Sequence, residues 1–258
     1  MNDQSTPEID DSKAPLIEHL IELRQRLLWA VAALVVAFGF SLFFADEIFA
    51  ILVKPLTAAF PVGEGKIIYT KLYEAFFVEI KVAMFAAFFL AFPIISNQLW
   101  AFVAPGLYSN EKKAFLPFLV ATPLLFMAGA ALAYFIVMPT AFRFFIGFEG
   151  EVGGLTQEAL PAMGDYLSLV MQFILAFGVC FQLPVLLLLL NRAGLVSREQ
   201  LKGLRRYMIV AAFALAAILT PPDVISQLML GIPLILLYEV SLAIMWFTDR
   251  KKIKTEEA

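Results

Sequence analysis

The sequence predicts an all-α, polytopic integral membrane protein with six transmembrane helices and both chain ends on the cytoplasmic side. Of its 258 residues, 61% are hydrophobic and 16% are charged, whereas soluble domains average about half apolar and about a quarter charged residues. A soluble protein of this composition would expose large apolar patches. The apolar residues also fall into long runs, and lysine and arginine gather in alternate segments between these runs.

Four runs are long enough to cross a bilayer, for which a helix needs about 20 mainly apolar residues. They are Leu27 to Ala45; Val82 to Trp100, beginning near Phe76; Phe115 to Met138; and Tyr166 to Leu190. Two long segments separate the first run from the second and the third from the fourth, Asp46 to Ala75 and Pro139 to Asp165. The sequence leaves open whether these segments are ordered caps or mobile loops.

Two adjacent prolines interrupt the last apolar stretch. Tyr207 to Leu219 is uncharged but has only 13 residues, about 20 Å of helix. Thr220-Pro221-Pro222-Asp223 then breaks the helix, because proline donates no N–H and restricts the residue before it. The apolar pattern resumes from Val224 to Phe247, interrupted by Glu239. This stretch is either a short helical hairpin or a single kinked span.

The basic residues favour the hairpin. With six spans, the inside segments contain 14 of the 19 lysines and arginines, including the clusters at 192–206 and 250–254. A single kinked span would place the C-terminal cluster outside, against the positive-inside rule. We therefore predict six helices with the N- and C-termini inside, and a bilayer that is thinned around the short fifth helix.

The chain divides into three regions, and its motifs exclude several function classes. Residues 1–15 are predicted to be a disordered polar tail, 16–247 a six-helix membrane domain and 248–258 a charged cytoplasmic tail. The sequence has no GxxxxGK[ST], CxxC or HExxH motif, and its single histidine, His19, is expected to face solvent. We expect no enzyme, no metal site, no cofactor and no nucleic-acid partner. Any energy that the protein uses must therefore come from another chain or from an ion gradient.

Two inside segments carry candidate binding residues. Leu16 to Leu27 is an amphipathic helix, in which Glu22 either pairs with Arg26 four residues later or is held at the surface for a cationic partner. The loop Gln98 to Lys113 is rich in aromatic residues, and Glu111 is its only acid. A carboxylate beside aromatic surface suits arginine, which pairs bidentately and stacks on rings.

Few polar residues lie within the apolar runs. Gln172 and Gln182 in the fourth run need hydrogen-bond partners, which a neighbouring helix or a docking partner would supply. Asp223 is expected to cap the N-terminus of the sixth helix, with Gln227 one turn later. Glu239, near the inside end of that helix, either snorkels to the surface or has a function.

Together these motifs resemble those of the TatC family, the receptor subunit of the twin-arginine protein translocase. The resemblance covers residues 16 to about 247, with the motifs in the family's order and at fitting spacing. They are the segment 19–27 (HLIELRQRL), Lys54-Pro55-Leu56, Phe76-Phe77 with Lys81, the segment 98–108 (QLWAFVAPGLY) followed by Glu111-Lys112-Lys113, Ala133-Tyr134-Phe135, Asp165-Tyr166, Phe177-Gly178-Val179, and Leu219-Thr220-Pro221-Pro222-Asp223 with Gln227.

The resemblance implies a receptor in the bacterial inner membrane for the Ser-Arg-Arg-type signal peptides of folded exported proteins. With TatA-like and TatB-like single-span partners, and with further copies of itself in a larger complex, such a protein opens a route driven by the proton-motive force. The implied fold is a curved, cup-like bundle. Glu22 and Glu111 become the main candidates for binding the two arginines, with Phe102, Arg24 and Arg26 beside them.

For contacts with partner helices or for translocation, the resemblance indicates Gln182, Gln227, Asp223, Tyr134 and Pro55. The motif Phe-x-x-Pro of the fourth helix departs from the family, because many members have glutamate where this chain has Gln182. An amide does not titrate near neutral pH. Any role of Gln182 is therefore expected to depend on hydrogen bonding rather than on proton relay.

Two other function classes compete with this hypothesis. A small-solute secondary transporter would place charged or unwound segments at mid-membrane, whereas this sequence concentrates its acids at the inside surface. An intramembrane enzyme would need a Ser/His pair, paired aspartates or a metal cluster, and the sequence shows none of these.

Overall fold

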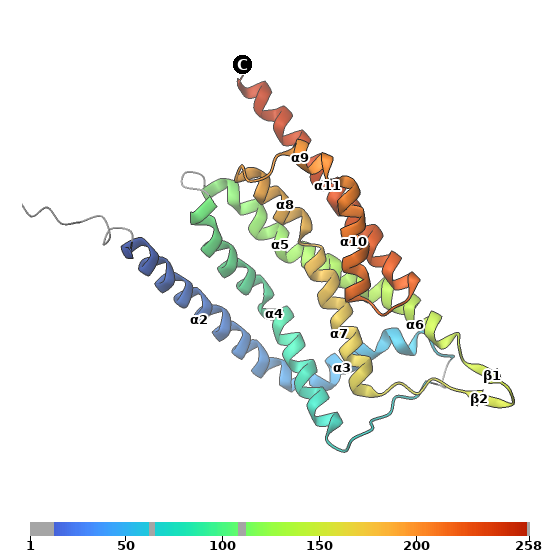
Figure 1. Cartoon of the computed structure of the whole chain (residues 1–258). Helices are drawn as coiled ribbons and strands as arrows, with labels where there is room; N and C mark the ends of the chain where they lie inside the picture. Colours follow the sequence, from blue (N-terminus) through green and yellow to red (C-terminus); the bar gives the residue numbers. More distant parts are fainter. Residues whose placement is uncertain (1–12, 62–64, 108–111, 257–258) are drawn as a thin grey trace, which may run out of the picture.

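The computed structural model describes residues 13–61, 65–107 and 112–256, and nearly all of them are helical (Figure 1). In chain order the elements are α2 (Lys13–Phe43), α3 (Ala45–Thr57), α4 (Glu74–Leu107), α5 (Lys112–Leu132), a π-helical turn η1 (Ala133–Val137), α6 (Met138–Ile146), β1 (Gly150–Val152), β2 (Leu155–Gln157), α7 (Met163–Cys180), α8 (Leu183–Arg192), α9 (Arg198–Gly203), α10 (Arg205–Leu219) and α11 (Val224–Glu256).

Five segments are long and apolar enough to cross a membrane. They are His19–Phe43, Glu74–Phe102, Pro117–Ile146, Met163–Arg192 and Val224–Thr248. These five agree with the four long runs and the last run predicted from the sequence. The remaining predicted span corresponds to α10, whose 15 residues measure about 22 Å and fall short of the roughly 30 Å of a hydrocarbon core.

The break at Pro221-Pro222 is confirmed, and it separates two packed helices, α10 and α11. Asp223 caps α11 as predicted, because its Oδ1 accepts a hydrogen bond from the backbone N–H of Ser226 at 2.7 Å. Gly231 lets α11 approach α10 closely, since a Cβ there would lie 2.7 Å from the Phe213 ring. These contacts make the last segment a helical hairpin rather than one kinked helix.

Two glycines allow α5 and α7 to pack closely. A Cβ added to Gly129 would collide with the backbone carbonyl of Phe177, and one added to Gly178 would lie 2.6 Å from the Phe126 ring. Phe126 and Phe177 are fully buried. Phe177 belongs to the core that α7 shares with α4, α5 and α10, and Phe126 stacks on the Phe92 ring of α4. Small residues at membrane helix interfaces allow such close approach, and the gain in van der Waals contact holds the helices together.

The two long segments 46–75 and 139–165, which separate apolar runs, are ordered caps in the described residues. The first contains α3, and the second contains α6 and the hairpin β1–β2. Ile68 joins the two segments, because its N–H donates to Pro161 O at 3.1 Å and its carbonyl accepts from Met163 N at 2.7 Å. The Glu74 carboxylate strengthens this junction by accepting the Gly164 N–H at 2.8 Å.

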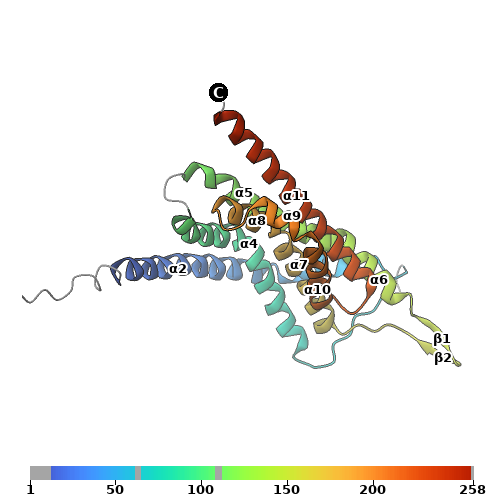
Figure 2. The same cartoon turned by 45° about the horizontal axis from the view of Figure 1, so that its top comes forward.

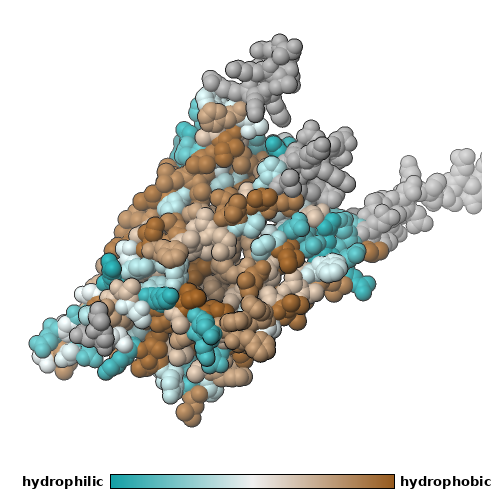
Figure 3. All heavy atoms as spheres, turned by 180° about the vertical axis from the view of Figure 1, so that it is seen from behind, coloured by the Kyte–Doolittle hydropathy of each residue, from teal (hydrophilic) through white to brown (hydrophobic). Residues whose placement is uncertain are grey.

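Helix α2 packs mainly along α4 and lies away from α10 and α11 in both views (Figures 1 and 2). Its apolar residues are largely exposed, among them Val35 at 62% and Val36 at 74%. Seen from behind, brown apolar residues cover the middle of the molecule and teal polar ones gather towards its ends (Figure 3). This distribution is that of a protein whose middle is surrounded by lipid.

Candidate functional site

The predicted binding residues of the first helix lie next to the end of α4. The imidazole ring of His19 on α2 stacks on the Phe102 ring on α4, with centroids 4.2 Å apart and an interplanar angle of 15°. Further along α2, Arg26 Nε donates to Glu22 Oε1 at 2.9 Å. The structure therefore brings Glu22, Arg26 and Phe102 together at one end of the bundle.

The Glu22 carboxylate has a second oxygen that faces this site. Its Oε1 accepts hydrogen bonds from Nε and Nη2 of Arg26, while Oε2 lies 3.9 Å from His19 Nδ1. The side chains of Glu22 and Arg26 are 36% and 27% exposed. A helical i,i+4 ion pair contributes only about 0.2–0.5 kcal/mol, and a carboxylate accepts several hydrogen bonds. Glu22 can therefore bind an incoming guanidinium while it still contacts Arg26.

The other predicted residues of this surface differ in how they are placed. Arg24 is exposed on α2. Glu111 lies outside the described residues, between the end of α4 and the start of α5. The two helices are held together close to this loop, because Trp100 Nε1 donates to Thr122 Oγ1 at 2.7 Å. The segment 98–107, which was predicted as part of a loop, is instead the end of α4.

Tyr134 and Pro55 form one structural unit. Proline at position 55 has no N–H to donate to the carbonyl of Ile51, four residues earlier in α3. The Tyr134 hydroxyl donates to this same carbonyl at 2.7 Å. The next carbonyl, that of Leu52, accepts the Tyr166 hydroxyl at 2.8 Å. Two tyrosines from the spans therefore fasten α3 to one end of the bundle.

Gln182 lies at the break between α7 and α8, in contact with α5. Its Nε2 donates to Thr122 O at 3.0 Å, and its buried Oε1 accepts no hydrogen bond from the described residues. Gln227 similarly donates to Phe213 O at 3.2 Å within the α10–α11 hairpin. In this chain alone, both amides serve interhelical hydrogen bonding.

For the transport function that the motif resemblance implies, we predict that Gln182→Glu leaves export of folded cargo working, because a carboxyl group that keeps its proton can donate to the Thr122 carbonyl as the amide does. Gln182→Leu keeps the volume but removes the donor, and should lower stability by about 0.6 kcal/mol, the average for such bonds in membranes. Export assays and thermal unfolding in detergent measure the two effects. Complete loss of export in Gln182→Glu would show that the protein depends on an amide at this position.

A family model described as "Sec-independent protein translocase protein (TatC)" matches residues 18–233. The chain belongs to the TatC family. The Sec-independent protein translocase protein TatC of Magnetococcus marinus is 50% identical over 248 residues, 96% of this chain and 90% of the relative. That of Aquifex aeolicus is 41% identical over 95% of this chain and 100% of its own length.

A crystal structure described as "Twin Arginine Translocase Receptor- TatC in DDM" is similar with a TM-score of 0.76 and 40% identity, over 88% of this chain and 98% of that one. TatC-family membership makes the chain a multi-pass membrane component of a protein translocase rather than a catalytic enzyme. The resemblance found in the sequence motifs is thereby confirmed.

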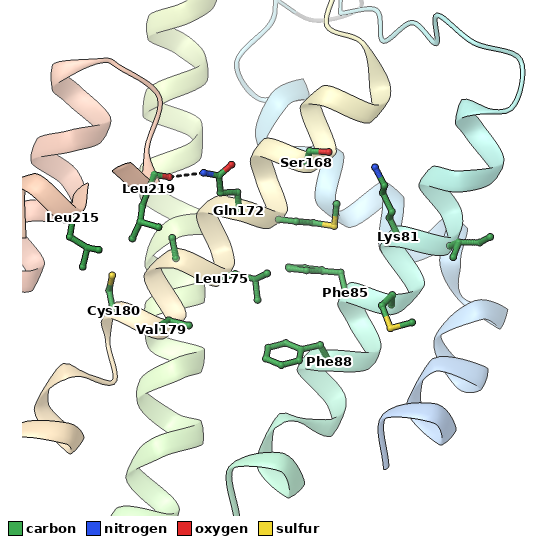
Figure 4. A pocket seen from close by; sticks show the side chains of 14 residues that line it. Lys81, Phe85, Phe88, Ser168, Gln172, Leu175, Val179, Cys180, Leu215 and Leu219 are labelled. Carbon is green, nitrogen blue, oxygen red and sulfur yellow. Dashed lines mark hydrogen bonds between the residues drawn. The ribbon is translucent and has the colours of Figure 1, made fainter. Parts of the chain in front are cut away.

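The TatC-family bundle also has a large apolar groove between α4, α7 and α10 (Figure 4). The groove has a volume of about 980 Å³, and its lining is apolar except for a few residues such as Lys81, Ser168 and Gln172. Gln172 Nε2 donates to the Leu219 carbonyl across the groove at 3.2 Å. Such a surface accepts an apolar helix more readily than a polar solute.

Two features of the site were not predicted from the sequence of this TatC-family protein. His19 faces solvent as predicted, with its side chain 46% exposed, but the stacking of its ring on Phe102 was not predicted. Glu239 was left between snorkelling and function, but it accepts a hydrogen bond from Arg205 Nη2 at 2.6 Å across the α10–α11 hairpin. Arg205 and Glu239 each lie 17 positions from Pro222, and this symmetry about the turn was a signal for their pairing.

Proposed function

We propose that this chain is the receptor that binds twin-arginine signal peptides of folded cargo at the inside end of the bundle. The observation that carries the proposal is the stacking of His19 on Phe102, which places the Glu22 carboxylate beside the aromatic end of α4. This surface offers what an arginine side chain binds best, a carboxylate and a ring face.

In this mechanism the two arginines divide between two carboxylates. One guanidinium pairs with Glu22 Oε2 and displaces part of the Arg26 contact, while the other pairs with Glu111 on the following loop. Phe102 supplies the ring face, Arg26 orients the Glu22 carboxylate through its hydrogen bonds, and Arg24 lies exposed on the same helix. A lysine makes no bidentate pair with a carboxylate, so twin lysines should bind less tightly.

We further propose six spans with both ends inside. In support, four helix ends lie at the end of the bundle opposite the hairpin β1–β2 (Figure 1). They are the start of α2, the end of α4, the start of α10 and the end of α11. The short α10 then crosses a locally thinned bilayer. The membrane domain is 16–247, the segment 248–258 continues from it as a cytoplasmic tail, and the tail of residues 1–15 precedes it.

A topology experiment follows from this orientation. Glu151 is exposed on β1, at the proposed outside end, so Glu151→Cys should react with an impermeant thiol reagent added to intact cells. Glu199→Cys, exposed on α9 at the inside end, is the matched control and should react only after lysis. Cys180, the single native cysteine, is buried and contributes little background. Labelling of Glu151→Cys only after lysis would overturn the six-span arrangement.

The proposed setting is the bacterial inner membrane, where TatA-like and TatB-like single-span proteins and further copies of this chain complete the complex. The apolar groove and the α10–α11 hairpin, with Asp223 and Gln227 at its turn, are the proposed docking faces. These faces are held in place by interhelical contacts within the bundle, to which Gln182, Tyr134 and Pro55 contribute. The proton-motive force drives transport.

Export of a folded reporter tests the proposed function directly. Cells that rely on this chain should export a reporter with an intact Arg-Arg pair, and should fail with Lys-Lys. Two small single-span proteins should co-purify with the chain after mild detergent extraction. Uptake of a small solute by the purified chain in liposomes, without these partners, would instead support the alternative of a small-solute secondary transporter.

A further inference from the structure

The loop that leads into α4 exposes a group of apolar side chains at the cap end of the bundle, where the segments 46–75 and 139–165 lie. Leu72 is 96% exposed, and Tyr69, Tyr73, Phe76 and Phe77 are each more than half exposed. The Phe77 ring lies edge-on to the rings of Tyr73 and Phe76, with centroids 5.8 and 5.5 Å away. An exposed apolar cluster of this kind marks a contact surface.

The loop 69–73 is held in a defined conformation by the Glu74 carboxylate. Its Oε2 accepts the N–H and the hydroxyl of Thr70 at 2.7 and 3.0 Å, and the N–H of Lys71 at 3.3 Å. The Glu74 N–H in turn donates to the Lys71 carbonyl at 2.9 Å. Folding Leu72 back onto the protein would break these bonds. The exposure of Leu72 is therefore built into the turn.

The register of α2 and α4 places this loop at the edge of the hydrocarbon core. The two helices pack antiparallel (Figure 1), and the stacking of His19 on Phe102 shows which residues lie at the same depth. Leu27, where the first apolar run begins, follows His19 by eight positions and is therefore level with Ile94, eight positions before Phe102. A hydrocarbon core of about 30 Å takes about 20 helical residues. Counted from Ile94 towards the start of α4, it ends near Glu74.

The residues of the loop suit the zone just beyond the hydrocarbon. Irregular backbone is excluded from hydrocarbon, because its N–H and C=O groups need partners, but the headgroup zone supplies them. Tyrosine is enriched there, since its ring lies against acyl chains while its hydroxyl stays hydrated. Phe76 and Phe77 already belong to the membrane-spanning stretch Glu74–Phe102. The cluster therefore continues the lipid-facing surface of α4, which favours lipid over a water-soluble partner.

We propose that the loop 69–73 is a lipid anchor, whose leucine and two tyrosines insert into the interface of the bilayer leaflet at the cap end. The loop is bonded to the other cap segment, because Ile68 pairs with Pro161 and Met163, and Glu74 accepts the Gly164 N–H. Anchoring the loop thus fixes the height of the whole cap above the membrane. Only the name of this leaflet, the outer one, rests on the proposed topology, so failure of the anchor leaves the signal-peptide site untouched.

Spin labelling of the purified chain in liposomes of dioleoyl phosphatidylcholine and dioleoyl phosphatidylglycerol tests the anchor. A nitroxide on Leu72→Cys is relaxed by oxygen, which concentrates in hydrocarbon, and by a neutral nickel chelate, which stays in water. The ratio of the two effects should be several-fold larger at position 72 than on Leu155→Cys, an equally apolar and exposed position on β2. Val36→Cys, exposed in the middle of α2, should give the largest ratio. Cys180 is buried, so the label reacts with the introduced cysteine.

Two results would overturn the proposal. A ratio at position 72 as low as that at 155 would place the loop in water. A label at position 72 that is shielded from both reagents, while the label at 36 stays accessible to oxygen, would show that a second copy of the chain covers the loop instead of lipid. Leu72→Cys changes a side chain that is almost fully exposed, so the labelled chain should fold normally.

Discussion

Replacing Glu22 with alanine should weaken the binding of a twin-arginine signal peptide by at least about tenfold. A hydrogen bond to a charged group is worth about 1.5–3 kcal/mol, and each 1.4 kcal/mol is a factor of ten. The Glu22→Ala protein should still insert, because the side chain is partly exposed and its only described ion partners are His19 and Arg26 on the same helix. Peptide binding in detergent, measured by fluorescence anisotropy, gives the dissociation constants.

Three further proteins make this result specific. Glu22→Gln keeps the size of the side chain and loses its charge, so it should behave like Glu22→Ala. Glu47→Ala removes an exposed acid from α3 at the opposite end of the bundle and should bind the peptide normally. Glu111→Ala should weaken binding by a similar factor. Normal binding by both the Glu22 and Glu111 variants would refute the proposed recognition site.

Gly129→Ala should destabilise the fold by about 1–3 kcal/mol, the usual cost of overpacking, and Gly129→Leu should prevent accumulation of the protein. The collision is with the Phe177 backbone carbonyl, which cannot move unless α5 and α7 separate. Thermal unfolding in detergent measures the loss for alanine, and the amount in the membrane fraction measures it for leucine.

Gly39 provides a matched control for this packing argument. It lies within α2, and no heavy atom would come within 4 Å of a Cβ at this position. Gly39→Ala should therefore leave stability unchanged or raise it by about 0.5–1 kcal/mol, because alanine is the better helix former. An equal loss in Gly39→Ala and Gly129→Ala would show that the α5–α7 approach has no special role.

The spans could be predicted because the signal for each is local. Apolar length identifies five of them, and the two prolines identify the turn of the last hairpin. Capping by Asp223 and pairing of Glu22 with Arg26 also depend on residues three or four positions apart, and both are confirmed. A helix thus specifies its own short-range contacts in its sequence.

Contacts between distant segments could not be predicted in the same way. The motifs around Pro55 and Tyr134 were both recognised, but neither one shows that the two residues act together. Pro55 has no N–H for the Ile51 carbonyl, and the Tyr134 hydroxyl donates to this carbonyl instead. The same holds for His19, whose partner Phe102 lies 83 positions later. The order within the two caps, segments 46–75 and 139–165, also depends on long-range hydrogen bonds, such as that between Glu74 and Gly164.

We propose that a twin-arginine signal peptide first binds where α2 meets the end of α4. Photo-cross-linking in native membranes tests this binding site. The signal peptide carries a photoreactive residue directly after its two arginines, and the adducts are mapped by mass spectrometry. We expect adducts within residues 19–26 and 98–113. Adducts concentrated on the hairpin 150–157, or on the groove between α4, α7 and α10, would contradict this proposal.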